Sequence, residues 1–262
     1  MKIGFIGAGN MGGAIIGGII KNGISKDILV SDKNKEASDA LCKKFGIKAA
    51  ADNIDAAKNS DILFLAVKPN VIDIVISEIK DFVSEDVLII SIVAGKSIEY
   101  IEKAFEKKIK LIRVMPNTPA LVGEGMSALC ENKNVKKEDM EKALDIFSGL
   151  GEAEEVTENI MDAVTAVSGS SPAYIFMMIE AMADGAVAGG MPRSQAYKFA
   201  AQATLGSAKM VLETGKHPGE LKDMVCSPAG TTIEAVKVLE EKGLRCAVID
   251  AMKACMDKSK KL

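Results

Sequence analysis

Residues 2–16, KIGFIGAGNMGGAII, indicate the fold class of this chain more strongly than any other segment. The apolar start of this stretch, KIGFIG (2–7), predicts a strand, and the residues from Asn10 to Lys21 predict a helix. The turn between them, GAGNMG (7–12), fits the pattern GxGxxG of dinucleotide-binding βαβ units. The three glycines permit the tight turn, the approach of a pyrophosphate to the backbone, and the packing of helix against strand. The pyrophosphate would lie at the helix N-terminus, where unpaired N–H groups and the helix dipole favour an anion.

An acidic residue follows this motif at the distance expected for a ribose contact. Asp32 lies twenty residues beyond Gly12, at the end of the second predicted strand. A carboxylate there can hydrogen-bond the 2′- and 3′-hydroxyls of an adenosine ribose. The structural alternative is that Asp32 caps the turn into the helix predicted over 35–45. Motif and context together predict a binding site for NAD(H) or NADP(H).

The rest of the first half alternates strands and helices. Apolar runs at 28–30, 61–67, 87–94 and 110–114 predict strands, with a further short segment at 47–50. A nearly continuous run such as DILFLAV is typical of a strand buried on both faces of a parallel sheet. We therefore predict an α/β fold that begins with a doubly wound Rossmann dinucleotide-binding domain.

The second half of the chain changes character. From Asn159 onward no segment predicts a strand, and helical periodicity extends over 159–189, 194–214 and 231–258. We predict a Rossmann domain over 1–157 and an all-α domain over 158–262, joined without a flexible linker and so enclosing a fixed cleft. Because the alanine- and methionine-rich helices are too apolar for one small exposed domain, we expect a homodimer with a large interface.

Composition excludes several classes of function. The net charge is −3, aromatic residues make up 4 % of the chain and tryptophan is absent, so a nucleic-acid partner is not expected. One histidine and five cysteines without CxxC spacing predict no metal site, and cysteines of this kind suit a reducing compartment. The uncharged stretch from Ile3 to Ile20 contains seven glycines and Asn10, which argues against a membrane span. We expect a cytoplasmic protein with no membrane partner.

The carboxyl ends of the strands should line the cofactor crevice, because ligands bind there in open α/β sheets. Lys68, after the fourth predicted strand, can contact a phosphate or ribose, or can be a solvated lysine before a helix. Ala94 and Gly95 fit either a close backbone approach or a simple turn. The candidate cofactor residues at these ends are Gly7, Ala8, Gly9, Asn10, Met11, Gly12, Ser31, Asp32, Lys33, Asn53, Ala66, Val67, Lys68, Ala94 and Gly95.

Three further stretches carry a resemblance to a known family. They are MPNTP (115–119), SGSSPAYIFMMIEAMADGAVAGGMPR (168–193) and SPAGTTI (227–233), the last followed by a helix with Arg245. In this order and spacing, nearly the whole chain resembles the pyrroline-5-carboxylate reductases.

The resemblance implies an activity and an assembly. It implies reduction of the C=N bond of 1-pyrroline-5-carboxylate to L-proline with NADP(H) or NAD(H), and a Rossmann domain followed by a helical domain. The helical domains of two subunits would interlock, and the dimers could form a ring. Substrate would lie between the nicotinamide and the loop 227–232 at the subunit interface. Met115 and Asn117 would lie near the nicotinamide.

Two positions depart from the family pattern. Ser171 and Ala229 stand where the family usually has glycine. If glycine at 229 normally supplies a positive φ, alanine there costs some strain.

The loop SPAGTTI suits a carboxylate and an imine. Ser227, Gly230, Thr231 and Thr232 lie at a predicted helix start, where free N–H groups and hydroxyls can hold a carboxylate. The resemblance places Thr232 nearest the imine nitrogen, as the catalytic hydrogen-bond partner or proton donor. The alternatives are that either threonine only caps the helix, and that water or the substrate's own protonation supplies the proton.

Other polar residues are interpreted as structural. His217, the only histidine, lies in GKHPGEL between two helices and is expected to begin the second. Glu180 and Asp184 lie four apart on one helix face, without an evident acid–base partner. The competing functions are a β-hydroxyacid dehydrogenase or another imine reductase, and a non-catalytic dinucleotide sensor. The hydroxyacid enzymes need a lysine on the first interdomain helix, and none occurs between Asn159 and Arg193.

Overall fold

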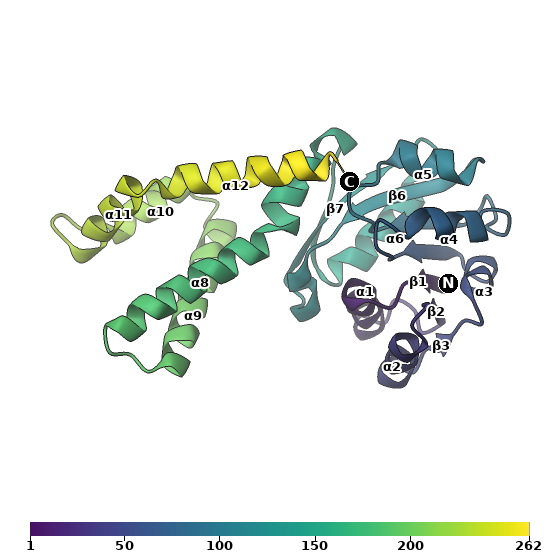
Figure 1. Cartoon of the computed structure of the whole chain (residues 1–262), viewed down its shortest axis with the longest axis horizontal. Coiled ribbons are helices and arrows are strands. Elements are labelled where there is room, and N and C mark those ends of the chain that lie inside the picture. Colours follow the sequence, from purple (N-terminus) through teal and green to yellow (C-terminus); the bar gives the residue numbers. More distant parts are fainter. Residues whose placement is uncertain (262) are drawn as a thin grey trace. The chain divides into compact units, whose positions relative to one another are not determined.

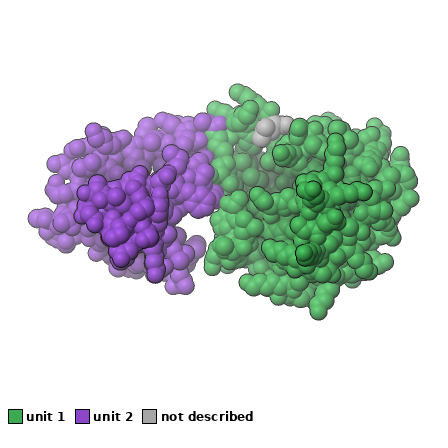
Figure 2. All heavy atoms as spheres, turned by 60° about the horizontal axis from the view of Figure 1, so that its bottom comes forward, with its two compact units in different colours: residues 1–170, 255–262 green, residues 171–254 purple. Residues whose placement is uncertain are grey.

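A computed structural model describes residues 1–261 of the chain. The chain divides into two compact units, coloured separately in Figure 2. The first unit contains residues 1–170 together with the chain end from Cys255, and the second contains Ser171–Ala254. The contacts thus divide the chain after residue 170, whereas the domain boundary expected from sequence lies after residue 157 and stays a prediction.

The first unit is built on one sheet of eight strands in the order β3-β2-β1-β4-β5-β6-β7-β8 (Figure 1). The strands β1 to β6 all run parallel, and their order 3-2-1-4-5-6 is that of the Rossmann fold predicted from sequence. The first six strands are β1 (Ile3–Ile6), β2 (Ile28–Ser31), β3 (Lys48–Ala49), β4 (Ile62–Leu65), β5 (Leu88–Ser91) and β6 (Lys110–Met115).

Successive side chains of the central strands point to opposite faces of the sheet and contribute to two separate hydrophobic cores. On one face Phe5 stacks on Phe64 with ring centroids 4.4 Å apart, and Phe147 of α6 (Lys137–Ser148) packs beside Phe64 with ring centroids 6.2 Å apart. On the other face, neighbours in the same strands such as Ile6 and Leu65 meet another set of helices. Helices α1 (Asn10–Lys21), α2 (Lys35–Phe45) and α6 (Lys137–Ser148) cover the first face, and α3 (Asn53–Lys58), α4 (Ile72–Ile79) and α5 (Ile98–Phe105) cover the second.

Two strands at one edge of the sheet were not expected from sequence. Strand β7 (Gly125–Glu131) pairs antiparallel with β6, and β8 (Gly151–Glu155) pairs parallel with β7. The sequence of β8, GEAEE, is polar and begins with glycine, so it has little intrinsic tendency to form a strand. It forms one because β7 offers a free edge for pairing.

A short irregular segment follows the sheet. It consists of a 3₁₀ turn over Glu158–Ile160, helix α7 (Met161–Val164) and a π-helical turn over Thr165–Gly169. The chain end packs on this segment, where Ser259 Oγ donates to Asp162 Oδ1 at 2.7 Å and Cys255 Sγ lies 3.2 Å from Ser170 Oγ. Residues at the end of the chain thereby complete the first unit.

The second unit is entirely helical, as predicted. One prediction is wrong in detail: the helix expected over 231–258 is not continuous. It is interrupted at Lys242 and Gly243, where Gly243 has φ 73°. The elements are α8 (Ser171–Ala188), α9 (Arg193–Thr214), α10 (Pro218–Val225), α11 (Thr231–Glu241) and α12 (Leu244–Ser259), the last of which ends in the first unit.

In the single chain these helices expose much apolar surface. Only four apolar side chains between residues 171 and 254 are buried, and three of them are alanines. Phe176, Met177, Phe199 and Leu212 are all more than 60 % exposed. Within residues 1–261, no helix is both long and apolar enough to cross a membrane.

Candidate active site

The glycine-rich turn has the geometry that close approach requires. Gly7 has φ 114°, and a Cβ there would lie 2.4 Å from the Ala66 carbonyl oxygen. A Cβ on Gly12 would lie 2.6 Å from the Gly7 oxygen, so α1 can start this close to β1 only with glycine. A Cβ on Gly9 would meet nothing within 4 Å. The backbone at Gly9 is therefore open to a ligand, while the other two glycines are needed for the turn itself.

The start of α1 leaves backbone donors unpaired. Its first intrahelical bond runs from the Gly13 N–H to the Gly9 oxygen at 2.8 Å, so the N–H groups of Asn10, Met11 and Gly12 have no intrahelical acceptor. The N-cap residue, Gly9, supplies no side chain to satisfy them. Ala8, Gly9 and Asn10 line one end of a groove of about 610 Å³ that extends along α1 toward α2. A phosphate fits the chemistry of this donor set.

Asp32 bonds to the backbone with both carboxylate oxygens. Oδ2 accepts from the Ala8 N–H at 2.6 Å, and Oδ1 accepts from the Asn34 N–H at 2.8 Å. The cap of α2 is Asn34, whose side chain accepts from the Glu36 N–H, so Asp32 shapes the turn without capping the helix itself. Asp32 thus ties the end of β2 to the glycine turn, and Lys33 next to it is exposed.

The remaining predicted cofactor residues lie at the carboxyl ends of β2, β4 and β5, except Asn53, which begins α3. Ser31 Oγ donates to Asn53 Oδ1 at 2.7 Å, and Asn53 Nδ2 donates to Glu78 Oε2 at 2.7 Å. Lys68 is exposed, and its side chain makes no ion pair within residues 1–261. After these strands come Ala66 and Val67, which are half-buried, and the turn Ala94–Gly95, where Gly95 has φ 74°.

Asn117 of the MPNTP turn uses its amide inside the protein. Its Oδ1 accepts from the Met126 N–H at 2.9 Å, while its Nδ2 donates to the main-chain oxygen and the hydroxyl of Ser168 at 3.2 and 3.3 Å. The Met115 side chain packs against Gly169, where a Cβ would lie only 2.4 Å from the Met115 Cε atom. MPNTP thus holds the start of the SGSSP segment in place. This link was not predictable from sequence, because nothing in either segment indicates that they contact each other.

The threonines of the loop SPAGTTI are not helix caps. The N-cap of α11 is Gly230, with φ −80° and ψ 171°, and Thr231 and Thr232 are the first two helical residues. The capping alternative is therefore wrong for both. Neither hydroxyl makes a hydrogen bond within residues 1–261. The N–H groups of Thr231, Thr232 and Ile233 lack intrahelical acceptors, which gives this helix start the donors that a carboxylate needs.

Ser227 lies beside this helix start. A Cβ on Gly230 would fall 2.4 Å from Ser227 Oγ, so glycine at 230 leaves the room that this hydroxyl occupies. Ser227 is exposed, Thr231 is exposed and Thr232 is half-buried. All four predicted substrate residues therefore gather at the N-terminus of α11.

His217 begins the helix that follows it, as expected, and Asp184 of α8 has a structural partner. His217 caps α10, with its Nδ1 accepting from the Gly219 N–H at 3.1 Å. Asp184 pairs with Arg193, and Glu180 is exposed.

Cys130 is buried, and the pKa of its thiol is raised to about 12. Burial is the main cause, and the nearby Glu158 carboxylate adds to it. No group of histidine, cysteine and acidic side chains suited to a metal occurs within residues 1–261.

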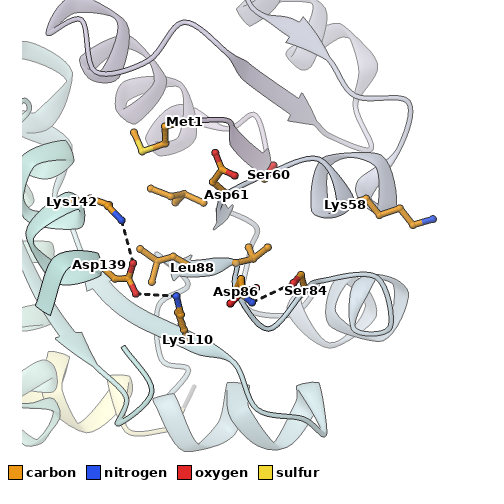
Figure 3. A pocket seen from close by; sticks show the side chains of 12 residues that line it. Met1, Lys58, Ser60, Asp61, Ser84, Asp86, Leu88, Lys110, Asp139 and Lys142 are labelled. Atoms are coloured by element: carbon orange, nitrogen blue, oxygen red, sulfur yellow. Dashed lines mark hydrogen bonds and ion pairs between the residues drawn. The ribbon is translucent and has the colours of Figure 1, made fainter. Parts of the chain in front are cut away.

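A second cavity, of about 480 Å³, lies at the opposite edge of the sheet, by the amino ends of the strands (Figure 3). Asp139 at the start of α6 is buried there, with Lys110 Nζ 3.2 Å from Oδ2 and Lys142 Nζ 3.5 Å from Oδ1. The Lys110 contact is an ion pair that is not aligned as a hydrogen bond. None of the predicted cofactor or substrate residues lines this cavity.

Comparison with protein-family models gives two matches. Residues 158–262 match the model for pyrroline-5-carboxylate reductase dimerisation. Residues 2–95 match the model for coenzyme F420-dependent NADP oxidoreductases. The first match supports self-association through the helical second half of the chain, and the second agrees with an NADP-type Rossmann domain.

Individual relatives match over the whole length. The pyrroline-5-carboxylate reductase of Escherichia coli (strain K12) is 56 % identical, over 100 % of this chain and 98 % of the relative. The solved structure of a pyrroline-5-carboxylate reductase from Coxiella burnetii has a TM-score of 0.92 and 38 % identity, covering 99 % and 97 % of the two chains. The crystal structure of a Plasmodium falciparum pyrroline carboxylate reductase with NADP bound has a TM-score of 0.91 and 35 % identity, covering 100 % and 97 %.

Proposed function

The chain belongs to the pyrroline-5-carboxylate reductase family, and we propose from this that it reduces 1-pyrroline-5-carboxylate to L-proline with a nicotinamide cofactor. The observation that carries the proposal is full-length identity of 56 % to a relative of that name, which includes the whole helical half. The residues support it independently, because the chain offers one unpaired helix start for a phosphate, at α1, and another for a carboxylate, at α11.

The residues at the carboxyl edge of the sheet fit a dinucleotide. The open backbone at Gly9 and the unpaired N–H groups of Asn10, Met11 and Gly12 would hold the pyrophosphate. Asp32 faces two backbone N–H groups, yet each carboxylate oxygen keeps a lone pair for a ribose hydroxyl. When bound, the reduced nicotinamide supplies the hydride, and the protein supplies orientation and electrostatics.

Cofactor choice follows from opposing charges around Asp32. Its carboxylate repels a 2′-phosphate and so favours NADH. Lys33 and Lys35, both exposed, can offset that repulsion, and the Plasmodium relative binds NADP. We propose that both cofactors support turnover, with a modest preference between them.

The loop before α11 would bind and orient the substrate. The N–H groups at the start of α11, with the hydroxyls of Ser227 and Thr231, would hold the carboxylate. The Thr232 hydroxyl, which has no partner within residues 1–261, would donate to the imine nitrogen as the imine carbon accepts hydride. The nitrogen gains one proton and the carbon one hydride, which balances the reduction to the amine, and water would return a proton to the Thr232 oxygen. A substrate that binds already protonated needs no proton transfer, and its N–H would donate to the Thr232 hydroxyl oxygen instead.

The helical second unit would complete the enzyme by pairing. We propose a homodimer as the working unit, because the exposed apolar residues of α8 and α9 need a partner surface, and a ring of dimers as a further assembly. Nothing in the composition indicates a nucleic-acid or membrane partner, and we propose that the protein works in the cytoplasm.

A substrate panel tests the proposed function. Purified protein is given NADPH or NADH with pyrroline-5-carboxylate, with a larger cyclic imine, and with the oxo acids that hydroxyacid dehydrogenases reduce. We expect loss of cofactor absorbance with the five-membered imine, without added metal. Faster turnover of the oxo acids would favour the β-hydroxyacid dehydrogenase alternative. Cofactor binding without turnover of any substrate would favour a dinucleotide sensor.

A further inference from the structure

The loop before α11 contains a backbone conformation that alanine disfavours. Ala229 has φ 55°, in the left-handed region. Within residues 1–261 the only other non-glycine residue with positive φ is Glu106, which ends α5, a common place for this conformation. Ala229 is exposed and lies in a loop between two helices, so neither a helix end nor burial accounts for its conformation.

The four residues 227–230 form a tight turn. The Gly230 N–H donates to the Ser227 oxygen at 3.0 Å, with Pro228 second and Ala229 third in the turn. Proline in the second position and positive φ in the third are the features of a type II turn, whose third position normally takes glycine. For other residues the left-handed region is disfavoured by a factor of roughly five to thirty.

The same four residues have a second way to turn. In a type I turn the bond between the first and fourth residues is kept, proline remains in the second position, and the third residue has negative φ. The two turns differ mainly by a rotation of the Pro228–Ala229 peptide through about 180°. Glycine at 229 favours the type II turn, whereas alanine shifts the balance toward type I. That peptide lies two peptide bonds before the one that carries the Thr231 N–H, the first of the free N–H groups at the start of α11.

We infer that Ala229 is a positioning residue that sets the apparent affinity for the substrate by making this turn exchange between two states, of which the left-handed state binds the carboxylate. The inference rests on the proposed function, which places the carboxylate at this helix start. When only a fraction of the molecules is competent to bind, the apparent dissociation constant rises by the inverse of that fraction. Substrate then has to select the left-handed turn.

A series of substitutions separates backbone conformation from side-chain size. Ala229→Gly should lower KM for pyrroline-5-carboxylate about two- to tenfold with little change in kcat, because the binding state becomes the resting state. Ala229→Asn keeps a larger side chain but tolerates the left-handed region, so its KM should also fall below that of the wild type. Ala229→Val should raise KM, because a β-branched residue resists positive φ.

The control is the second positive-φ position. Glu106→Gly relieves the same kind of backbone strain on α5, outside the proposed site, and should leave KM within about twofold. Each variant is first checked for folding by thermal melt. KM values that rise with side-chain size, so that asparagine is worse than alanine, would mean that the methyl group obstructs the substrate, and the inference would be wrong. Equal KM for glycine and alanine would also overturn it.

An NMR measurement on the protein without substrate distinguishes failure of the two-state turn from failure of the proposed function. In protein labelled with ¹³C at alanine methyl groups, the Ala229 signal, identified by its loss in Ala229→Gly, should show relaxation dispersion in the free protein. A single state of that methyl in the free protein refutes the inference, whatever the kinetics. Absence of turnover in the wild type, with the exchange present, would refute the proposed function and leave the two-state turn standing.

Discussion

At the scale of single residues, the proposed role of the loop in catalysis depends on the Thr232 hydroxyl, which has no hydrogen-bond partner within residues 1–261. A hydroxyl that neither caps its helix nor bonds elsewhere within residues 1–261 is available to a ligand. If Thr232 donates to the imine nitrogen as proposed, Thr232→Ala should lower kcat by about tenfold to a thousandfold and raise KM less, because that bond would strengthen as hydride arrives. Steady-state kinetics with pyrroline-5-carboxylate measures both parameters.

The neighbouring threonine provides the matched control. Thr231→Ala removes a hydroxyl one position earlier on the same helix and should reduce kcat much less. Thr232→Ser keeps the hydroxyl and should keep most of the activity. An unchanged kcat in Thr232→Ala would move the proton source to water or to the substrate's own protonation.

Asp32 carries the second residue-scale prediction, which concerns the cofactor. If Asp32 faces the ribose as proposed, Asp32→Ser removes a charge that would repel a 2′-phosphate and should raise the ratio of kcat/KM for NADPH over NADH by about tenfold. The substitution also loses one acceptor for the Ala8 and Asn34 N–H groups, so both cofactors should bind somewhat less well. The ratio, rather than either value alone, is the test. A ratio that does not move would show that Asp32 only braces the glycine turn.

Residue roles were predictable from sequence where one motif contains all the contacts. Gly12 is such a case, because a Cβ there would meet the Gly7 oxygen within the same motif. Asn117 is the opposite case. Its partner Ser168 lies 51 residues away, and the fold alone decides which carbonyl an amide side chain meets.

At the scale of elements, buried parallel strands were predictable and edge elements were not. The runs that became β4 and β5 are apolar throughout, and only burial on both faces explains such a run. Strand β8 contains three glutamates in five residues and depends on its neighbour for its existence. The break between α11 and α12 had one local signal, Gly243, whose positive φ ends the first helix.

The ion pair between the starts of α6 and β6 yields a prediction about pH. Burial alone would raise the pKa of Asp139, but contact with Lys110, together with the charges of Lys110 and Lys142, lowers it below its ordinary value. The ionised carboxylate therefore stabilises the fold above the unfolded pKa of about 3.9, and this contribution is lost as pH falls through the folded value. Asp139→Asn should destabilise the protein at pH 7 by about 1–3 kcal/mol.

Thermal melts at several pH values test this assignment. The difference in melting temperature between wild type and Asp139→Asn should be full at pH 7 and should shrink below about pH 4. Lys137→Gln is the control, because Lys137 forms an exposed pair with Glu141 on the same helix and should contribute about 0.5 kcal/mol or less. A difference that stays constant from pH 7 to pH 3 would mean that Asp139 contributes by shape rather than by charge.

At the scale of the whole molecule, the helical unit raises the question of assembly. Burial of a few alanines and one leucine between residues 171 and 254 is too little for a stable unit. We expect light scattering to give a mass of about 55 kDa or a multiple of it, from chains of 27.7 kDa. A stable, active monomer at micromolar concentration would contradict this expectation.

Two substitutions that each introduce a charge, one in each unit, test which unit forms the dimer interface. Phe199→Asp on α9, at a side chain 64 % exposed in the single chain, should weaken the dimer by at least tenfold. Ile74→Asp on α4 changes a side chain that is 69 % exposed in the first unit, and should leave the mass unchanged.

The central claim is that this chain reduces a cyclic imine to proline, and the most direct measurement is the stoichiometry of that reaction. Wild-type protein is mixed with pyrroline-5-carboxylate and a limiting amount of NADPH or NADH, in the presence of EDTA. Cofactor oxidation is followed by absorbance and proline by mass spectrometry. We expect one L-proline to form for each cofactor molecule oxidised, at a rate proportional to the enzyme concentration. Cofactor oxidation without proline, or no oxidation by folded protein with either cofactor, would contradict it.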